Sequence, residues 1–236
     1  MTGIGEHGAL GRREPTDWRH VERFPLFQLS LAERPKGVPS AIGINWYTEF
    51  DRPTEGNDGR WRIAQDARLT SIRGGHCICV LPNRFREYPT WWKFYNQGHE
   101  GSCVGFGVSR MMTNINRSLY NARWLYQQAQ LVDEWADTPP AEGTSVRAGL
   151  DVLRSVGNRR FNRGKLYEAD ISEGISANRW ATSLQDWLNV LDRPSAYEVP
   201  FVNSWGIRFP HITWVPVEVI ERLMNEGGEF SVVTDR

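Results

Sequence analysis

Apolar residues recur at helical spacing in the middle and near the end of the chain. The clearest run starts at Cys103, where apolar side chains return every three or four residues as far as Leu119. Four further helices are predicted, over residues 122–135, 145–157, 178–191 and 216–229. Hydroxyl residues supply candidate N-caps for the second and third of these four, namely Thr144 or Ser145, and Thr182 or Ser183. Gly157 is the expected stop of the helix over 145–157.

Shorter runs of apolar, aromatic and β-branched residues predict strands. These runs cover residues 40–50, 71–82, 197–205 and 230–235. The intervening residues 51–62 contain Pro, Gly, Asn and Asp, a composition typical of a loop. Strands come first, helices follow, and the two types then mix toward the C-terminus. This order predicts an α+β fold with two lobes.

The charge balance argues against nucleic-acid and membrane partners. Lys and Arg together number 28, and so do Asp and Glu, which makes the formal net charge zero. Such a chain lacks the positive potential that attracts nucleic acid or an acidic membrane surface. No apolar run approaches the roughly 18 residues of a membrane span, and the N-terminus has no signal-peptide core. We therefore expect a cytoplasmic protein.

The first 39 residues differ in composition from the rest of the chain. They are rich in Gly, Arg and Pro and contain one short apolar piece, "FPLFQLSL". This composition predicts an extended N-terminal arm, which could dock on a protein partner or cross a cleft. The eleven tryptophans of the whole chain are expected to fill the core or line such a cleft.

Cys103 is a candidate nucleophile because it stands where the first helix is predicted to start. The N-terminus of a helix carries about half a positive elementary charge, which favours the thiolate form of a cysteine. Gly101 and Ser102 would let a substrate approach the backbone closely. The Gln97 side chain and the Cys103 backbone N–H could receive the negative charge of a tetrahedral intermediate. The alternative is a small buried apolar cysteine at the start of a helix.

Three motifs together favour the nucleophile. "NQGHEGSCVGF" at 96–106 resembles the cysteine motif of papain-like (C1 family) cysteine peptidases, and "EGTSVRAGLDVLRSVG" at 142–157 resembles a helix and turn of their bacterial and phage members. "VNSWG" at 202–206 resembles the family's Asn-Ser-Trp-Gly motif. The resemblance implies that Asn203 orients a catalytic histidine and that Trp205 shields their hydrogen bond. It implies no cofactor and no metal.

The expected histidine is missing between Cys103 and Asn203, where the family normally has it. Upstream of the cysteine, however, "SIRGGHCICVLP" resembles the family's histidine strand, and "SAIGINWYTEF" resembles the strand before it. The resemblance therefore implies a circular permutation, with His76 as general base. Triads are known in several chain orders. Of the other histidines, His211 is the second choice, His99 could touch the cleft, and His7 and His20 lie in the arm.

The segment "HCIC" also raises the question of a metal site. Side chains alternate faces along a strand, so His76 and Cys77 would point in opposite directions. Cys77 and Cys79 share a face, but no third ligand is near in the sequence, and they are too close together for an ordinary disulfide within one strand. We expect both cysteines in the core behind the histidine, and no metal.

The resemblance implies a papain-like domain over residues 40–236. Its β lobe would comprise 40–82 and 195–236 and its helical lobe 83–157, with an insertion of uncertain structure at 158–194. The implied activity is peptide hydrolysis through a Cys103–His76–Asn203 triad with Gln97 as oxyanion donor, acting on a polypeptide substrate. The alternative is a catalytically silent structural or binding protein on the same fold. The Arg- and Trp-rich composition resembles actinobacterial and phage proteins, which makes a virion-associated role conceivable.

Overall fold

Five helices and two sheets make up the part of the chain described by the computed structural model, residues 36–63, 69–85, 95–134 and 142–235. The helices are α1 (Cys103–Asn116), α2 (Ala122–Val132), α3 (Val146–Ser155), α4 (Leu184–Val190) and α5 (Val217–Asn225). The α+β class predicted from the sequence is therefore confirmed. None of the helices in these ranges is long and apolar enough to cross a membrane.

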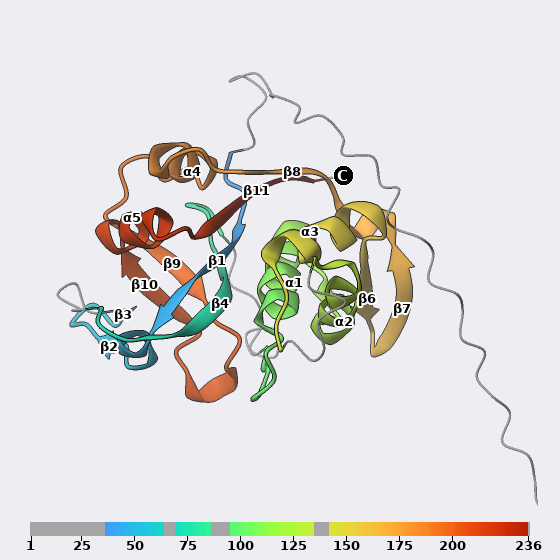
Figure 1. Cartoon of the computed structure of the whole chain (residues 1–236), viewed down its shortest axis with the longest axis horizontal. Helices are drawn as coiled ribbons and strands as arrows, with labels where there is room; N and C mark the ends of the chain where they lie inside the picture. The colour runs from blue at the N-terminus through green and yellow to red at the C-terminus, as the bar shows by residue number, and fades with distance from the viewer. Residues whose placement is uncertain (1–35, 64–68, 86–94, 135–141, 236) are drawn as a thin grey trace, which may run out of the picture.

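An eight-stranded sheet forms one half of the molecule (Figure 1). Its strands, in order across the sheet, are β2 (Thr54–Glu55), β3 (Trp61–Arg62), β10 (Ile212–Pro216), β9 (Glu198–Val202), β4 (Ile72–Val80), β1 (Ser40–Tyr47), β11 (Glu229–Asp235) and β8 (Ile175–Trp180). All neighbouring strands are antiparallel except β3 and β10. We call this sheet with α4 and α5 the sheet half.

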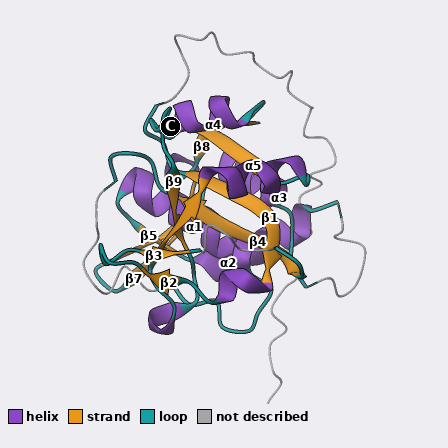
Figure 2. Cartoon of the chain, turned by 90° about the vertical axis from the view of Figure 1, so that its left-hand side faces the viewer, coloured by secondary structure: helices purple, strands orange, loops and turns teal. Residues whose placement is uncertain are grey.

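The other half contains α1, α2 and α3 with a three-stranded sheet, and we call it the helical half (Figure 1). The three strands are β5 (Leu119–Tyr120), β6 (Asn158–Asn162) and β7 (Lys165–Asp170). Figure 2, which views the molecule from the sheet half, shows β1 and β4 in front of α1 and α2. Within the sheet half, β4 is thus a strand that faces the helical half.

Segments from the two ends of the described chain join in the large sheet. Strand β4 pairs with β9, with Cys79 opposite Val202, and β1 pairs with β11, with Ile42 opposite Phe230. Since β9 ends at Val202, this register brings the residues that follow it close to the middle of β4. Sheet pairing, not sequence proximity, therefore determines which side chains meet at the end of β9.

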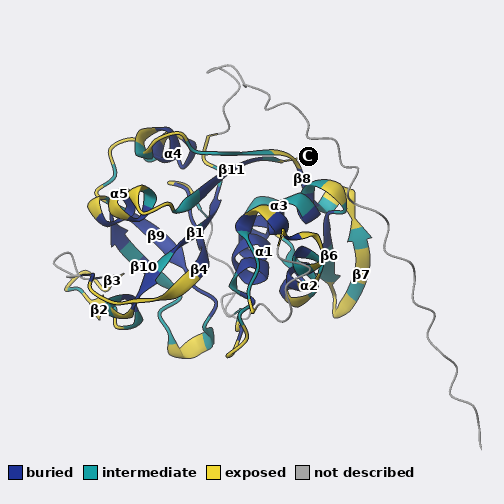
Figure 3. Ribbon diagram, viewed as in Figure 1, coloured by how far each residue is buried: buried dark blue, intermediate teal, exposed yellow. Residues whose placement is uncertain are grey.

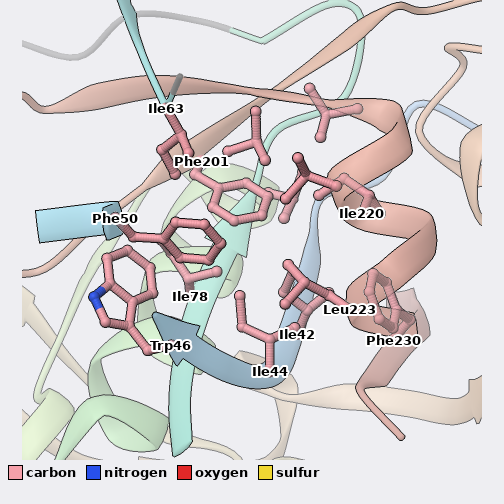
Figure 4. Packing of buried hydrophobic residues seen from close by; sticks show 14 of the residues in the cluster. Ile42, Ile44, Trp46, Phe50, Ile63, Ile78, Phe201, Ile220, Leu223 and Phe230 are labelled. Atoms are coloured by element: carbon pink, nitrogen blue, oxygen red, sulfur yellow. The ribbon is translucent and has the colours of Figure 1, made fainter. Parts of the chain in front are cut away.

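Strand β4 is buried on both faces along its second half (Figure 3). Ile78 and Val80 belong to the core of the sheet half together with Phe50, Phe201 and Ile220. Figure 4 shows Ile78 beside Phe50. Cys77 and Cys79 belong to a second core against α1 and α3. Both cysteines are free and buried, so their predicted place in the core is confirmed. No group of three metal-binding side chains occurs among the described residues.

The starts of α1 and α3 agree with the prediction, whereas the end of α1 does not. Helix α1 begins at Cys103, and the Ser145 hydroxyl accepts a hydrogen bond from the Ala148 N–H, which makes Ser145 the cap of α3. The extension of α1 to Leu119 is wrong. Arg117 adopts a left-handed conformation with φ of 53°, which ends the helix, and Leu119 enters β5.

The helix predicted over 178–191 is wrong in its first part. Residues 178–180 complete β8, where Asn178 pairs with Val233 of β11, and α4 starts at Leu184 after the cap Ser183. Pairing with a buried neighbouring strand overrides the local helical pattern here. The segment 158–194, expected to be an insertion of uncertain structure, holds β6, β7 and β8 before α4.

The loop and strand boundaries near the start also differ from prediction. Strand β1 ends at Tyr47, and Thr48–Asp51 forms a turn of 3-10 helix. The predicted loop 51–62 contains the two short strands β2 and β3. Positions 1–35 of the predicted arm, with His7 and His20, lie outside the described residues.

Candidate active site

His76 is held in β4 by a hydrogen bond to Asn203. The His76 Nε2 lies 3.1 Å from the Asn203 Oδ1, across 127 positions of sequence. The same Oδ1 accepts the backbone N–H of Ser204 at 2.7 Å, which identifies this atom as the carbonyl oxygen of the amide. Because a carbonyl oxygen only accepts, the proton of the neutral ring sits on Nε2. Nδ1 is then left as an unprotonated acceptor.

Two tryptophans enclose the His76 ring. The Trp205 ring centroid lies 5.3 Å from the imidazole centroid, and the Trp46 ring meets it edge-on at 4.7 Å. His76 is only 7% exposed. Burial lowers the pKa of His76 to about 4, although the bond to Asn203 acts in the opposite direction. The ring is therefore neutral at physiological pH.

This burial predicts that acid destabilises the fold through His76. The ordinary pKa of 6.5 applies to the unfolded chain, so between pH 6.5 and 4 the unfolded state binds the proton that the folded state excludes. The stabilisation that depends on a neutral His76 is complete above pH 6.5. As pH falls from 6.5 to 4, its loss lowers the free energy of unfolding by about 3 kcal/mol in total. Urea unfolding of wild type and His76→Gln at several pH values measures it.

The comparison of wild type with His76→Gln isolates the part of the pH dependence that is due to His76. Burial raises the pKa of Glu229 and Asp151, and these carboxyls stabilise the fold as pH falls, but they do so equally in both proteins. We expect the difference in unfolding free energy between wild type and His76→Gln to change steadily from pH 6.5 to 4. A constant difference would mean that the ring protonates freely in the folded state.

Cys103 lies beside the strand that carries His76. It is the first residue of α1, and its sulfur is close enough to the backbone N–H of Cys77 for that group to favour the thiolate. Cys77 is the next residue after His76, so α1 and β4 bring the thiol and the imidazole into one region. The Cys103 side chain is partly exposed, whereas Cys77 and Cys79 are buried.

The thiol and the imidazole are not hydrogen-bonded to each other within the described structure. Burial raises the pKa of Cys103 and lowers that of His76, so taken singly each group favours its uncharged form. The positive end of α1 and the mutual attraction of a thiolate and an imidazolium act in the other direction. Burial alone therefore favours a neutral thiol beside a neutral ring with an unprotonated Nδ1.

Gln97 joins the segment before α1 to the segment after β9. Its backbone N–H donates to the Ser204 carbonyl at 2.9 Å, and the neighbouring Asn96 forms a β-bridge with Trp205. The Gln97 side chain is buried, and its Nε2 donates to the Glu100 carbonyl at 3.2 Å. This bond orients the carboxamide and leaves the second hydrogen of Nε2 for another acceptor.

Gly101 and Ser102 shape the turn that leads into α1. A Cβ at Gly101 would lie 3.2 Å from the Gly143 backbone nitrogen, so close packing of two loops favours glycine there. Ser102 is fully buried, and its hydroxyl has no hydrogen-bond partner among the described residues. Its backbone carbonyl accepts the N–H of Phe106 in the first turn of α1.

The other histidines do not share the position of His76. His99 is exposed in the turn at 98–100, and His211 is partly buried just before β10. Asn203 bonds to His76 and to neither of these two rings. Of the predicted residues, the structure therefore joins His76, Asn203 and Trp205 directly, and it connects Gln97 to them through Ser204.

The sequence reasoning missed Trp46, Asp51 and Arg73. The Trp46 Nε1 donates to the Asp51 Oδ1 at 2.8 Å, and the Arg73 Nη1 lies 2.9 Å from both Asp51 oxygens. The Arg73 guanidinium lies 5.5 Å from the Trp205 ring centroid. The pairing of Trp46 opposite Gly74 could have suggested the tryptophan, but nothing local indicates that Asp51 and Arg73 meet.

Comparison of the chain with protein-family models, curated proteins and solved structures finds no match.

Proposed function

We propose that the protein is a cysteine peptidase with a papain-like, circularly permuted fold. The observation that carries the proposal is the meeting of residues from three distant parts of the chain. Asn203 holds Nε2 of His76 at 3.1 Å, and the sulfur of Cys103 lies against the backbone N–H that follows His76. A nucleophile, a base and an orienting amide are the parts that acyl transfer requires.

The permuted order agrees with the sheet pairing. Strands β1 and β4 precede the cysteine, yet they pair with β11 and β9 from the end of the chain. A histidine strand moved to the front of the chain would need these pairings in order to stay beside Asn203. Strand β4 also packs on α1 through Cys77, which keeps the histidine strand next to the nucleophile helix.

In the proposed reaction, His76 acts first as a base and then as an acid. Nδ1 takes the proton of the Cys103 thiol as the sulfur attacks a peptide carbonyl carbon. The bond to the leaving nitrogen breaks, and the imidazolium returns the proton to the departing amine. Water, deprotonated by the same ring, then hydrolyses the thioester. The proton passes from the sulfur to the ring once binding of the substrate has displaced water.

The surrounding residues would stabilise the charges that develop in this reaction. The remaining Nε2 hydrogen of Gln97 and the Cys103 backbone N–H are suited to bind the oxyanion of the tetrahedral intermediate. Asn203 accepts the Nε2–H throughout and stabilises the imidazolium. Trp205 covers this bond and limits competition from water.

One observation favours a second candidate, a catalytically silent structural or binding protein. The described structure contains no hydrogen bond from the Cys103 sulfur to His76, and burial raises the pKa of this thiol. A decayed site would retain the His76–Asn203 bond as a structural feature of the core. Reactivity of the thiol separates the two candidates.

Labelling with an epoxide peptide probe at pH 6 tests the proposal. We expect Cys103 to be alkylated at least about 100-fold faster than a free cysteine in a small peptide, because the neighbouring base activates it. Peptide mapping by mass spectrometry identifies the labelled residue. Cys77 and Cys79 serve as internal controls, since burial raises the pKa of both, that of Cys79 to about 12.

A variant at Gly75 shows whether the label reaches Cys103 through the proposed site. Gly75 lies on the same face of β4 as Cys77, and a Cβ there would have no neighbour within 4 Å. Gly75→Leu should therefore fold normally but slow the labelling by the bulky probe more than labelling by iodoacetamide. Labelling at the rate of a simple exposed thiol would support the silent candidate.

A further inference from the structure

Arg73 occupies an irregularity in β4 three residues before His76. Trp46 pairs with Gly74, and Tyr47 pairs with Ile72, so Arg73 is an extra residue with no partner of its own on β1. In a regular strand, positions 73 and 76 would point to opposite faces. One extra residue reverses this alternation, and β-bulges next to active sites commonly redirect a side chain in this way.

The bulge places the Arg73 side chain at the edge of the candidate active site. Its guanidinium lies 5.5 Å from the Trp205 ring centroid, and the His76 ring centroid lies 5.3 Å from the same point. Arg73 and His76 are near enough for the positive charge of Arg73 to act on the imidazole. The cation thus lies beside Trp205 and close to the base.

Asp51 holds the Arg73 side chain in place but does not occupy all of its hydrogen-bond donors. Both Asp51 oxygens contact the same nitrogen, Nη1, at 2.9 Å. Asp51 is itself fixed by the indole N–H of Trp46. Nε and Nη2 of Arg73 form no hydrogen bond with any described residue, and the side chain is 55% exposed. An arginine held by one nitrogen keeps a planar set of donors for a carboxylate.

The chemistry of the reaction places the leaving-group part of the substrate in the region of His76, Trp205 and Arg73. His76 must protonate the departing nitrogen, so the residues after the scissile bond lie toward the imidazole and continue past Trp205. Ile72 and Ile207, which are close in sequence to Arg73 and Trp205, are both largely exposed. A substrate that crosses Trp205 therefore reaches the unoccupied donors of Arg73.

We propose that Arg73 binds a carboxylate in the leaving-group part of the substrate, so that the preferred substrates are peptides with a negative charge just after the scissile bond. This inference rests on the proposed peptidase function. The carboxylate can be an acidic side chain or the C-terminus of the peptide, and both are recognised by the same guanidinium donors.

Cleavage of matched peptides tests the preference. One cleavage site is first located by mass spectrometry in a digest of unfolded casein. Four peptides that span this site are then made, each ending three residues after the scissile bond. They combine Asp or Asn at the second position after the bond with a free or an amidated C-terminus. We expect wild type to cleave charged peptides with about fivefold higher kcat/KM, mainly through KM, and less so in high salt. The Asp and free-acid arms distinguish the two sources of the charge.

Three variants assign this preference to Arg73. Arg73→Gln should abolish the ratio of kcat/KM between the charged and the uncharged peptide, and Arg73→Lys should retain part of that ratio. Arg52→Gln, an exposed arginine next to Asp51, should leave it unchanged. A wild type without charge preference, or an Arg73→Gln protein that keeps it, would overturn the proposal.

A binding measurement separates failure of this inference from failure of the proposed function. The Cys103→Ala protein, which has no nucleophile, is titrated with Ala-Ala-Asp and with Ala-Ala-Asn amide, and the indole N–H signal of Trp205 is followed by NMR. Selective, Arg73-dependent binding of the acid supports the inference even if wild type hydrolyses nothing. Equal response to both tripeptides contradicts it even if wild type is an active peptidase.

Discussion

Replacement of Cys103 by alanine is expected to reduce peptide hydrolysis to the assay background. Removal of the nucleophile from a catalytic triad costs on the order of a million-fold in kcat, because the remaining groups cannot form the covalent intermediate. The side chain is small and only partly buried at the start of α1, so its loss should cost at most about 1 kcal/mol of stability. Cleavage of fluorescently labelled casein, followed for hours, measures the effect.

Cys79→Ala is the matched control for this substitution. Cys79 carries the same thiol, but it is fully buried in β4 against α1 and α3. Its replacement should lower the unfolding temperature slightly and leave the activity per folded molecule within about twofold. A Cys103→Ala protein that still hydrolyses casein at a substantial rate would exclude the thioester mechanism.

The parts of the site that the sequence could predict are those that depend on short motifs. The start of α1 at Cys103 follows from the change to helical spacing, and the strand around His76 follows from β-branched and apolar residues. The choice of His76 over His211 came from flanking residues that resemble a histidine strand. In the structure His76 is the histidine that meets Asn203.

The rest depends on pairing between distant segments, which no local pattern encodes. The register of β4 against β1 decides that Arg73 is an extra residue, and a shift by one position would send its side chain to the other face. In the same way, residues 178–180 come directly before an apolar pattern compatible with a helix, but they pair with residues 231–233 of β11. The raised pKa of the thiol and the lowered pKa of the imidazole depend on burial, which is also a property of the folded chain.

Replacement of His76 by glutamine is the second large effect that we expect. Glutamine is similar in length and can still donate to Asn203, but it cannot take a proton from the Cys103 thiol. Hydrolysis should fall by at least 10³-fold, since a positioned general base contributes about 10²- to 10⁴-fold and the same group also protonates the leaving amine. Fluorescent casein cleavage at pH 7 measures the loss.

The rate of alkylation of Cys103 distinguishes loss of a base from loss of structure. In His76→Gln the thiol keeps its place at the start of α1 and its neighbour, the Cys77 N–H, so its exposure should not change. Its reaction with iodoacetamide at pH 6 should nevertheless slow by 10-fold or more, and the rate should then rise with pH as for an isolated buried thiol. His99→Gln, which removes an exposed imidazole from the turn before α1, should change neither rate. If His76→Gln and wild type were alkylated equally fast at every pH, then His76 would be a structural partner of Asn203, and the base would have to be sought elsewhere, first at His211.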